Sequence, residues 1–416
     1  MEAIMYRKAL ILFYSIFLLL IMQCSDTAMK PGPIDPPNLT PAQREVITAS
    51  NSFAFNIFKE IVNNEADTNI FISPLSISYA LGMTYNGAEG ETKEAMADVL
   101  GFAGMDDLEI NESYRDLTKT LITIDPEVIM EIANSIWYRQ GFEVEQEFID
   151  INQEYFDAYV AALNFNNPGA KDIINDWIEE KTHDKIQDVI KQIDPLTMMF
   201  LVNAVYFKAA WKYEFDPDDT EVEDFYLSGG AAVDCDMMHQ ENELFRYFND
   251  NFQAVQLPYG DAGFCMSIFL PRQGHPLDDL IDQMDDDAWS DWMGNFTADT
   301  TIIKMPKFKL KYDRELKPDL AALGMGIAFE PYDADFSRIN PEIDLYITSV
   351  LHSTFVQVDE EGTEAAAVTV VEIGTTSIDP NENLMHINRP FFFVIHDQYT
   401  DAILFMGKIS NPVWED

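Results

Sequence analysis

The stretch VDEEGTEAAAVTVVEIGTTSIDPNENLMHINRPFFFVIHD, residues 358 to 397, decides how this sequence is interpreted. An apolar, strand-like run leads into it, and the run PFFFVIHD from Pro390 leads out of it. The middle is too long for a turn between two strands. Loops of this length in compact folds are usually functional or disordered, so the candidate functional segment of the chain lies here.

Residues 363 to 373 alternate as a strand with one buried and one wet face does. The odd-numbered positions are uncharged and mostly small, whereas the even-numbered positions carry both charges, Glu364 and Glu372. Gly362 provides a flexible pivot at the start, and no proline precedes Pro380, so the segment is free to pair with other strands. The same pattern fits an ordinary edge strand, so the alternation alone does not assign a function.

Helical signals concentrate in the first half of the chain. Ser73 and Pro74 provide a helix N-cap and a first-turn proline. Thr92 precedes the run KEAMADVL and Gly101 follows it, which predicts a second helix. The segment KDIINDWIEEKTHDKI, from Lys171, repeats apolar residues at helical spacing and predicts a third.

The second half is rich in strand-length runs that are apolar or alternating. These runs are FCMSIFLP from Phe264, TIIKMPKFKLKY from Thr301, LYITSVLHSTFVQVD from Leu345, PFFFVIHD from Pro390 and AILFMGKIS from Ala402. Helices followed mainly by long strands predict an α+β fold around a large, mainly antiparallel sheet. Neither a repeat nor a Pro/Gly-rich linker interrupts residues 40 to 416, which predicts a single domain there.

Charge is the outlier of the composition. The 416 residues carry 26 Lys and Arg against 72 Asp and Glu, a formal net charge of −46. Such a surface repels phosphate backbones, so we expect no nucleic-acid partner. With 47% hydrophobic residues the chain is able to bury a large core.

The N-terminus predicts export. A basic pair precedes fourteen apolar or small residues, 9 to 22, too few for a membrane span but typical of a signal peptide at residues 1 to 23. Cys24 stands where a bacterial lipoprotein signal places its lipidated cysteine, so we expect membrane attachment through Cys24; ordinary cleavage nearby is the alternative. The proline-rich residues 24 to 39 predict an extended tether. The expected location is extracellular or in the cell envelope.

Catalytic motifs are missing from the sequence. It holds no G-x-S-x-G elbow, no GxxxxGK[ST] loop and no H-E-x-x-H pair. The six histidines have no metal-ligand spacing, so we expect no metal, no cofactor and no enzymatic activity. Cys235 and Cys265 lie in apolar, strand-like surroundings and are interpreted as buried thiols; a disulfide between them stays open.

The run Glu360-Glu361-Gly362-Thr363-Glu364-Ala365-Ala366-Ala367 resembles the hinge of the serpin reactive loop, which reads acidic, acidic, Gly, Thr, Glu and then alanines. Other stretches resemble the family in the same order along residues 45 to 413. They are NIFISPLSISYALGMTYNGA from Asn69, INDWIEEKTHDKI from Ile174, LVNAVYFKAAWKYEFDPDDTEVEDF from Leu201, LPYG from Leu257 and NRPFFFVIHDQYTDAILFMGKISNP from Asn388. The chain thus resembles the serpins, and among them the secreted bacterial inhibitors.

The resemblance implies a metastable serpin fold with a large central sheet, further sheets, about nine helices and an exposed reactive loop at residues 360 to 389. It implies a hinge that consists of Glu361, Gly362, Thr363, Glu364, Ala365, Ala366 and Ala367. It also implies a polar cluster beneath the opening of the sheet, formed by Ser73, Ser76, Asn203 and His352, with Trp211 near the point where the loop enters.

The function implied is that of an irreversible, monomeric suicide-substrate inhibitor of serine proteases. The protease would form an acyl-enzyme with the loop, and insertion of the cleaved loop into the sheet would trap a covalent 1:1 complex. The family spacing from Gly362 places the scissile bond at Thr376-Ser377, with Thr375-Thr376 and Ile373-Gly374 left open. A small β-branched residue at this position suits elastase-like or subtilisin-like proteases.

Two alternatives keep the fold and change the function. One is an inhibitor of papain-like cysteine proteases, and the other is a non-inhibitory binding protein. Non-inhibitory members tend to carry bulky, charged or proline residues in the hinge, and the alanine run Ala365 to Ala367 has none of these, which favours inhibition.

Overall fold

The computed structural model describes residues 38 to 363 and 383 to 415. Several predicted features lie outside the described residues: the signal peptide 1 to 23, Cys24, nearly all of the tether, the hinge residues Glu364, Ala365, Ala366 and Ala367, and the candidate scissile bonds, including Thr376-Ser377. The described hinge residues are Glu361, Gly362 and Thr363.

The described part of the chain contains nine α-helices, concentrated in its first half. They are α2 (Pro41–Asn64), α3 (Pro74–Tyr85), α4 (Gly90–Leu100), α5 (Asp107–Leu121), α6 (Gln146–Phe156), α7 (Ala170–Lys181), α8 (Leu277–Asp282), α9 (Asp286–Gly294) and α10 (Lys317–Leu320). Helix α2 starts with a reciprocal cap between Thr40 and Gln43. Helix α3 starts as predicted, because the Ser73 hydroxyl accepts a hydrogen bond from the Ser76 amide.

A six-stranded sheet positions the functional segment. Its order is β10 (Phe308–Glu315), β11 (Leu351–Val358), β12 (Gly362–Thr363), β4 (Met199–Ala210), β2 (Val128–Arg139) and β3 (Tyr159–Leu163). All neighbours are antiparallel except β2 and β3, which are parallel. The expected large, mainly antiparallel sheet is confirmed. Its shortest strand is β12, which has two residues and lies between β11 and β4.

The second sheet has nine strands. Its order is β1 (Ile70–Ile72), β15 (Ile403–Ile409), β14 (Phe391–Asp397), β8 (Phe264–Pro271), β7 (Phe252–Tyr259), β6 (Ala232–Phe248), β9 (Thr297–Pro306) and β13 (Leu384–His386), and β5 (Glu221–Tyr226) pairs with β6. Strands β8, β14 and β15 are buried along their whole length, as their predicted apolar runs require. The chain therefore has the expected α+β fold with further sheets.

Four predicted element boundaries are wrong. Helix α4 begins before Thr92, whose hydroxyl instead accepts a hydrogen bond from the Asp335 amide. Helix α7 ends at Lys181, because the next turn is broken by His183 and Asp184 with positive φ. The run from Thr301 splits into β9 and β10, which belong to different sheets, just after Pro306, a residue without an amide donor.

The fourth wrong boundary concerns the run from Leu345. Strand β11 begins at Leu351, opposite Glu315, where its partner β10 ends. The Glu315 carboxylate instead accepts a hydrogen bond from the Val350 amide. The residues before Leu351 therefore have no strand beside them with which to continue the ladder.

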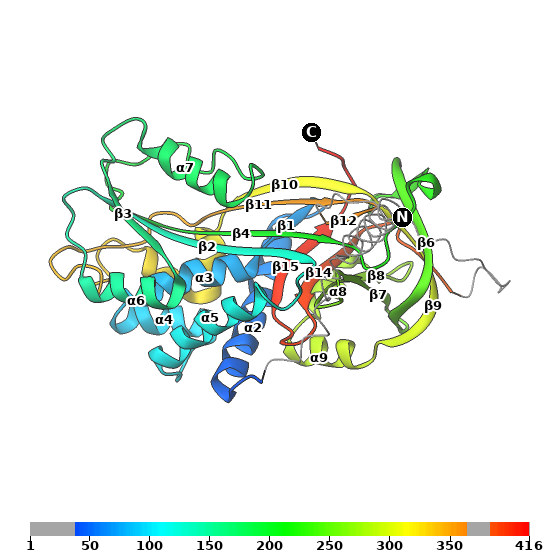
Figure 1. Cartoon of the computed structure of the whole chain (residues 1–416), viewed down its shortest axis with the longest axis horizontal. Coiled ribbons are helices and arrows are strands. Elements are labelled where there is room, and N and C mark those ends of the chain that lie inside the picture. Colours follow the sequence, from blue (N-terminus) through cyan, green and yellow to red (C-terminus); the bar gives the residue numbers. More distant parts are fainter. Residues whose placement is uncertain (1–37, 364–382, 416) are drawn as a thin grey trace, which may run out of the picture. The chain divides into compact units, whose positions relative to one another are not determined.

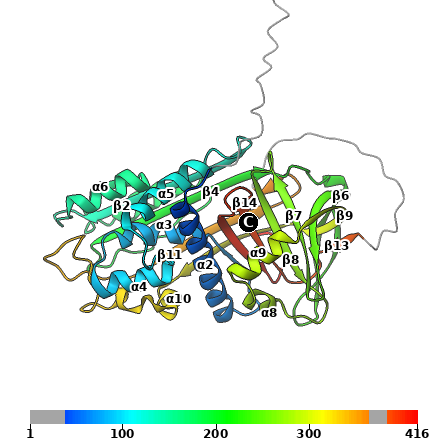
Figure 2. The same cartoon turned by 90° about the horizontal axis from the view of Figure 1, so that it is seen from below.

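Helices cover both faces of the six-stranded sheet (Figure 1). Helix α7 packs on β2 and β4 from one side, over a small apolar cluster that includes Trp137, Ile174 and Ile178. Helix α3 packs against β4 from the other side, where Figure 2 shows it among α2, α4, α5 and α6. The main hydrophobic core joins this side of the sheet to the nine-stranded sheet.

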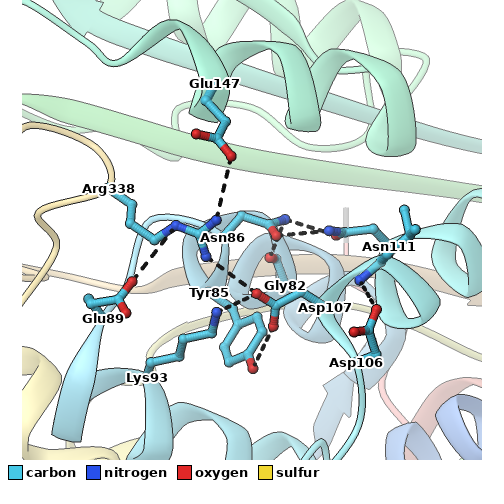
Figure 3. Close-up of polar contacts among 11 residues, drawn as sticks. Gly82, Tyr85, Asn86, Glu89, Lys93, Asp106, Asp107, Asn111, Glu147 and Arg338 are labelled. Atoms are coloured by element: carbon cyan, nitrogen blue, oxygen red, sulfur yellow. Dashed lines mark hydrogen bonds and ion pairs between the residues drawn. The ribbon is translucent and has the colours of Figure 1, made fainter.

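The segment that leads into β11 is anchored to the helices through Arg338 (Figure 3). Its guanidinium lies 3.3 Å from the Asp107 carboxylate and 3.9 Å from both Glu89 and Glu147. Burial disfavours ionisation of Asp107, but hydrogen bonds from Lys93 and its other neighbours outweigh burial and lower the pKa of this carboxyl. The chain segment that precedes β11 is thereby tied through Arg338 to the starts of α4 and α5 and to α6.

The remaining sequence expectations concern the two strand cysteines, metal ligands and membrane-spanning helices. The thiols of Cys235 and Cys265 are free and buried, so no disulfide joins them, and burial raises their pKa to about 11 and about 12. No group of three His, Cys, Asp or Glu side chains among the described residues is arranged to hold a metal ion. None of the helices in residues 38 to 363 and 383 to 415 has the length and apolar character that crossing a bilayer requires.

Candidate functional site

The centre of the six-stranded sheet is incompletely paired. Strand β4 pairs along its whole length with β2 on one side, and β11 pairs along its whole length with β10. Within the described residues, the facing edges of β4 and β11 are bridged only by Gly362 and Thr363, which pair with Ala209, Ala210 and Val358. The facing edges of β4 and β11 therefore present backbone groups with which a further strand could pair.

A cavity of about 390 Å³ lies at this interruption. Side chains of β4, of β11 and of the segment just before β11 line it, together with residues of α3 and α7. Its walls are mostly apolar, and Ser73, Ser76, Asn203 and His352 add polar groups to them. The position and lining of this cavity suit a polypeptide strand that inserts between β4 and β11. The gap between these two strands is called the slot below.

The two bridging residues enter the sheet through a tight turn. The Asp359 carboxylate accepts hydrogen bonds from the amides of Glu361 and Gly362, at 3.1 and 3.3 Å. The Asp359 amide donates to the Gly362 carbonyl, which closes the turn. An aspartate that bonds the backbone two residues ahead commonly stabilises such turns, so the chain reverses from β11 directly into β12.

Gly362 is required by close backbone contact. A β-carbon at this position would lie 2.1 Å from the carbonyl oxygen of Ala209 on β4. No real β-carbon approaches a backbone oxygen so closely, so any other residue would push the start of the hinge out of the sheet. The predicted pivot is thus the residue at which the chain enters the sheet beside β4.

Thr363 is buried against two aromatic rings. Its hydroxyl lies 2.5 Å from the hydroxyl of Tyr259, whose ring stacks on Trp211 with ring centroids 4.4 Å apart. The Trp211 indole donates to the Asp359 carbonyl at 2.9 Å, and the Trp211 backbone amide donates to the Glu361 carbonyl. Trp211 and Tyr259 therefore hold the chain on both sides of the turn.

Glu360 fixes the turn from its other side. Its carboxylate accepts hydrogen bonds from Lys307, at 2.7 Å, and from Thr220, at 2.8 Å. Burial opposes the charge of this carboxylate, but these donors outweigh burial and hold the pKa of Glu360 below its ordinary value. The residues at the start of the hinge are thus anchored to the flanks of β5 and β9 through Thr220 and Lys307.

The predicted polar cluster is brought together at the cavity wall. The Ser73 amide donates to Nε2 of His352 at 3.1 Å, and the Ser73 hydroxyl donates to the Leu404 carbonyl. The side-chain amide of Asn203 donates to the side chain of Asn134 at 2.8 Å. Within the described residues, the buried carbonyl oxygen of the Asn203 side chain has no hydrogen-bond partner.

Burial controls the charge of His352. The ring is fully buried, and burial lowers its pKa from 6.5 to about 4, against a smaller opposing influence of Asp313. At neutral pH the ring is therefore uncharged, and its Nε2 is free to accept the Ser73 hydrogen bond. Protonation would replace this acceptor with a donor that faces another donor.

Sequence reasoning found the hinge, the cluster and Trp211 but missed several partners. Tyr259, Glu360 and Lys307 hold the hinge, and Asn134 holds Asn203. Tyr259 lies in the quoted motif LPYG, and Glu360 opens the quoted hinge, so for these two a signal existed. Asn134 stands in ordinary strand sequence opposite Asn203, and Lys307 lies between β9 and β10, so only the tertiary structure brings these two partners here.

Comparison with known proteins assigns the family. Residues 48 to 412 match the family model described as serpin, serine protease inhibitor. The chain belongs to the serpin family. Serpins are generally inhibitors that bind proteases rather than enzymes, and the interrupted sheet and hinge of this serpin are the features just described.

Relatives cover nearly the whole of this serpin. It is 34% identical over 375 residues to an uncharacterized serpin-like protein of Thermococcus kodakarensis, covering 89% of this chain and 86% of the relative. It is similar in structure to tengpin, a thermophilic serpin in its native state, with a TM-score of 0.82, 30% identity and coverage of 92% and 97%. Human thyroxine-binding globulin complexed with thyroxine is similar too, with a TM-score of 0.82, 28% identity and coverage of 89% and 100%.

We predict that this serpin loses stability as the pH falls from about 6.5 to about 4 through its buried His352. The unfolded ring takes up a proton near pH 6.5 and the folded ring only near pH 4, so the stabilising contribution is complete above 6.5 and is lost through this window. The shift corresponds to about 3 kcal/mol. The measurement is the midpoint of thermal unfolding as a function of pH.

A His352→Gln variant is the control for this prediction. His396 is also fully buried with a pKa of about 4, so part of the decline persists in both proteins. The variant should be less stable than the wild type at pH 7 and should approach it near pH 4. Parallel curves for the two proteins would contradict the role assigned to His352.

Proposed function

We propose that this serpin is an irreversible inhibitor of serine proteases that traps its target by inserting the cleaved loop between β4 and β11. The observation that carries the proposal is the interruption of the sheet, where Gly362 and Thr363 already occupy the first positions of an additional strand. In residues 363 to 373 the odd-numbered positions are uncharged and mostly small, and both charges, Glu364 and Glu372, fall on even-numbered positions, as suits a strand with one buried face.

The energetics of insertion favour trapping. Fourteen residues from Thr363 would extend over roughly 48 Å as a strand, enough to carry a covalently attached protease along the sheet. With about 1 kcal/mol net per ladder hydrogen bond and burial of the small side chains, insertion would release on the order of 10 kcal/mol. Distorting the oxyanion hole of the protease by even one donor costs about 10²-fold in deacylation rate.

The native state of such an inhibitor must be kinetically trapped. The turn at Asp359, the Trp211 and Tyr259 stack, and the Arg338 anchor each restrain one part of the slot. The neutral His352 ring adds a hydrogen bond beneath the sheet. These contacts support a state in which the gap between β4 and β11 stays without its inserted strand until the loop is cut.

The hinge distinguishes inhibition from a carrier function. Thyroxine-binding globulin, a structural relative, is complexed with thyroxine, so the same fold also serves ligand binding. In this chain the hinge from Thr363 to Ala367 has no proline and no bulky side chain to block entry into the slot. This composition favours inhibition over a pure binding role.

The proposal predicts covalent complexes with serine proteases. Incubation with elastase-like, subtilisin-like, trypsin-like and papain-like enzymes should give SDS-resistant 1:1 complexes with the first two, because a β-branched residue suits their shallow pockets. Mass spectrometry of the released C-terminal fragment should place the cut at Thr376-Ser377. Complexes only with the papain-like enzyme would support the cysteine-protease alternative, and no complex with any enzyme would contradict inhibition.

Charge on the inserting face should convert the inhibitor into a substrate. We predict that Thr363→Arg is cleaved without forming complexes, because its cation would have to enter the buried contact with Tyr259. The matched control is Glu364→Arg, at a position predicted to face solvent, which should keep complex formation. The measurement is the ratio of complex to cleaved inhibitor; equal ratios for both variants would overturn the assignment of faces.

Cleavage of the loop should itself stabilise the protein. After a cut between residues 373 and 377 by a non-target protease, insertion without a tethered enzyme should raise the thermal midpoint by on the order of 10 °C or more. The measurement is thermal unfolding of intact and nicked protein under the same conditions. An unchanged midpoint after complete nicking would favour the non-inhibitory alternative.

A further inference from the structure

One exposed face of the hairpin β5–β6 carries only acidic and apolar side chains. Val222 and Tyr226 are large apolar residues that are 67% and 45% exposed. Asp224 lies between them on β5, directly opposite Asp234 of β6, and Asp236 lies opposite Val222. Cross-strand partners project from the same face of a sheet, so these five side chains form one surface, here called the β5–β6 face.

The charges of the β5–β6 face are not balanced within the molecule. In the described part of the chain, no Lys, Arg or His lies within ion-pair distance of Asp224, Asp234 or Asp236. The nearby cations contact another carboxylate: Glu223, the neighbour of Asp224 on β5, binds Lys304 and lies 3.1 Å from His386. Like charges directly opposite each other destabilise a sheet, so the Asp224–Asp234 pair costs stability that the isolated protein does not recover.

The β5–β6 face lies beside the end of the reactive loop. An open hollow of about 400 Å³ is lined by Val222, Asp224, Tyr226 and Asp234 together with His386 and Asn388. The Tyr226 amide donates to the Asn388 carbonyl at 2.8 Å, which joins β5 to the chain just beyond β13. The described chain resumes at residue 383, immediately before β13, so the hollow is close to where the loop returns to the body.

We propose that the β5–β6 face is a secondary docking surface for the target protease and selects proteases whose surface beside the active site is cationic. This inference rests on the proposed inhibition, since a protease held at the loop is brought next to this face. Complementary charge would relieve the Asp224–Asp234 repulsion, and an exposed aromatic side chain such as Tyr226 is typical of interface centres.

Docking on the β5–β6 face should change the rate of encounter and leave the trapping step alone. Electrostatic steering raises association rates and is screened by salt. Among the described residues, the side chains of Asp224 and Asp234, which the test replaces, bond neither to the turn at Asp359 nor to the β4 and β11 edges. The fraction of encounters that end in a complex rather than a cleaved inhibitor should therefore stay constant.

The test compares Asp224→Asn/Asp234→Asn with Glu94→Gln/Glu109→Gln, which removes two exposed charges from α4 and α5 instead. Rates of complex formation are measured with a cationic and an anionic protease of one specificity, at about 20 and about 300 mM NaCl. We expect the β5–β6 variant to lose on the order of 10-fold in rate with the cationic enzyme at low salt. The loss should shrink at high salt, and the α4–α5 variant should stay near wild type.

The outcomes separate this inference from the proposed function. Complexes that form at equal rates in both variants would overturn the docking surface and leave inhibition standing. An equal slowing of both variants would also overturn it, because the effect would then be one of total charge. Absence of complexes for the wild-type protein with every protease would overturn inhibition and, with it, this inference. Thermal unfolding of both variants verifies that they are folded.

Discussion

The structure depends on an unfinished hydrogen-bond ladder in the middle of a sheet. Strands β4 and β11 are each paired on their outer sides, yet in the described residues only Gly362 and Thr363 join their facing edges. Backbone groups inside a sheet normally find partners, so this arrangement leaves free energy unrealised. The proposed inhibition uses that free energy when a cut loop supplies the missing strand.

Restraints at both ends of the slot keep the sheet in this state. At one end, the Asp359 turn and the stacked rings of Trp211 and Tyr259 hold the hinge at its first two residues. At the other end, Arg338 ties the chain before β11 to carboxylates of three helical segments. Charged contacts at partly exposed positions are individually weak and separable, which suits a restraint that has to release.

Part of the chain's negative charge is concentrated on the β5–β6 face. A net charge of −46 acts on every cation that approaches, but the β5–β6 face concentrates unpaired carboxylates beside the loop exit. General negative charge has no preferred position, whereas under the proposal the opposed aspartates in register give a protease a place to dock. The proposed docking surface and the loop would then act together on one enzyme.

The sequence by itself determined the fold class, because capping residues and apolar strands are local signals, whereas the hinge and the polar cluster were predicted from the resemblance to the family. It did not determine that TIIKMPKFKLKY serves two sheets, or that β11 starts six residues later than its apolar run, since these follow from the partners available to each strand. The contacts of Lys307 with Glu360 and of Asp224 with Asp234 were decided only by tertiary structure. Lys307 and Glu360 are far apart in the sequence, and Asp224 faces Asp234 only because of the register of β5 and β6. No local pattern encodes which strands will lie side by side.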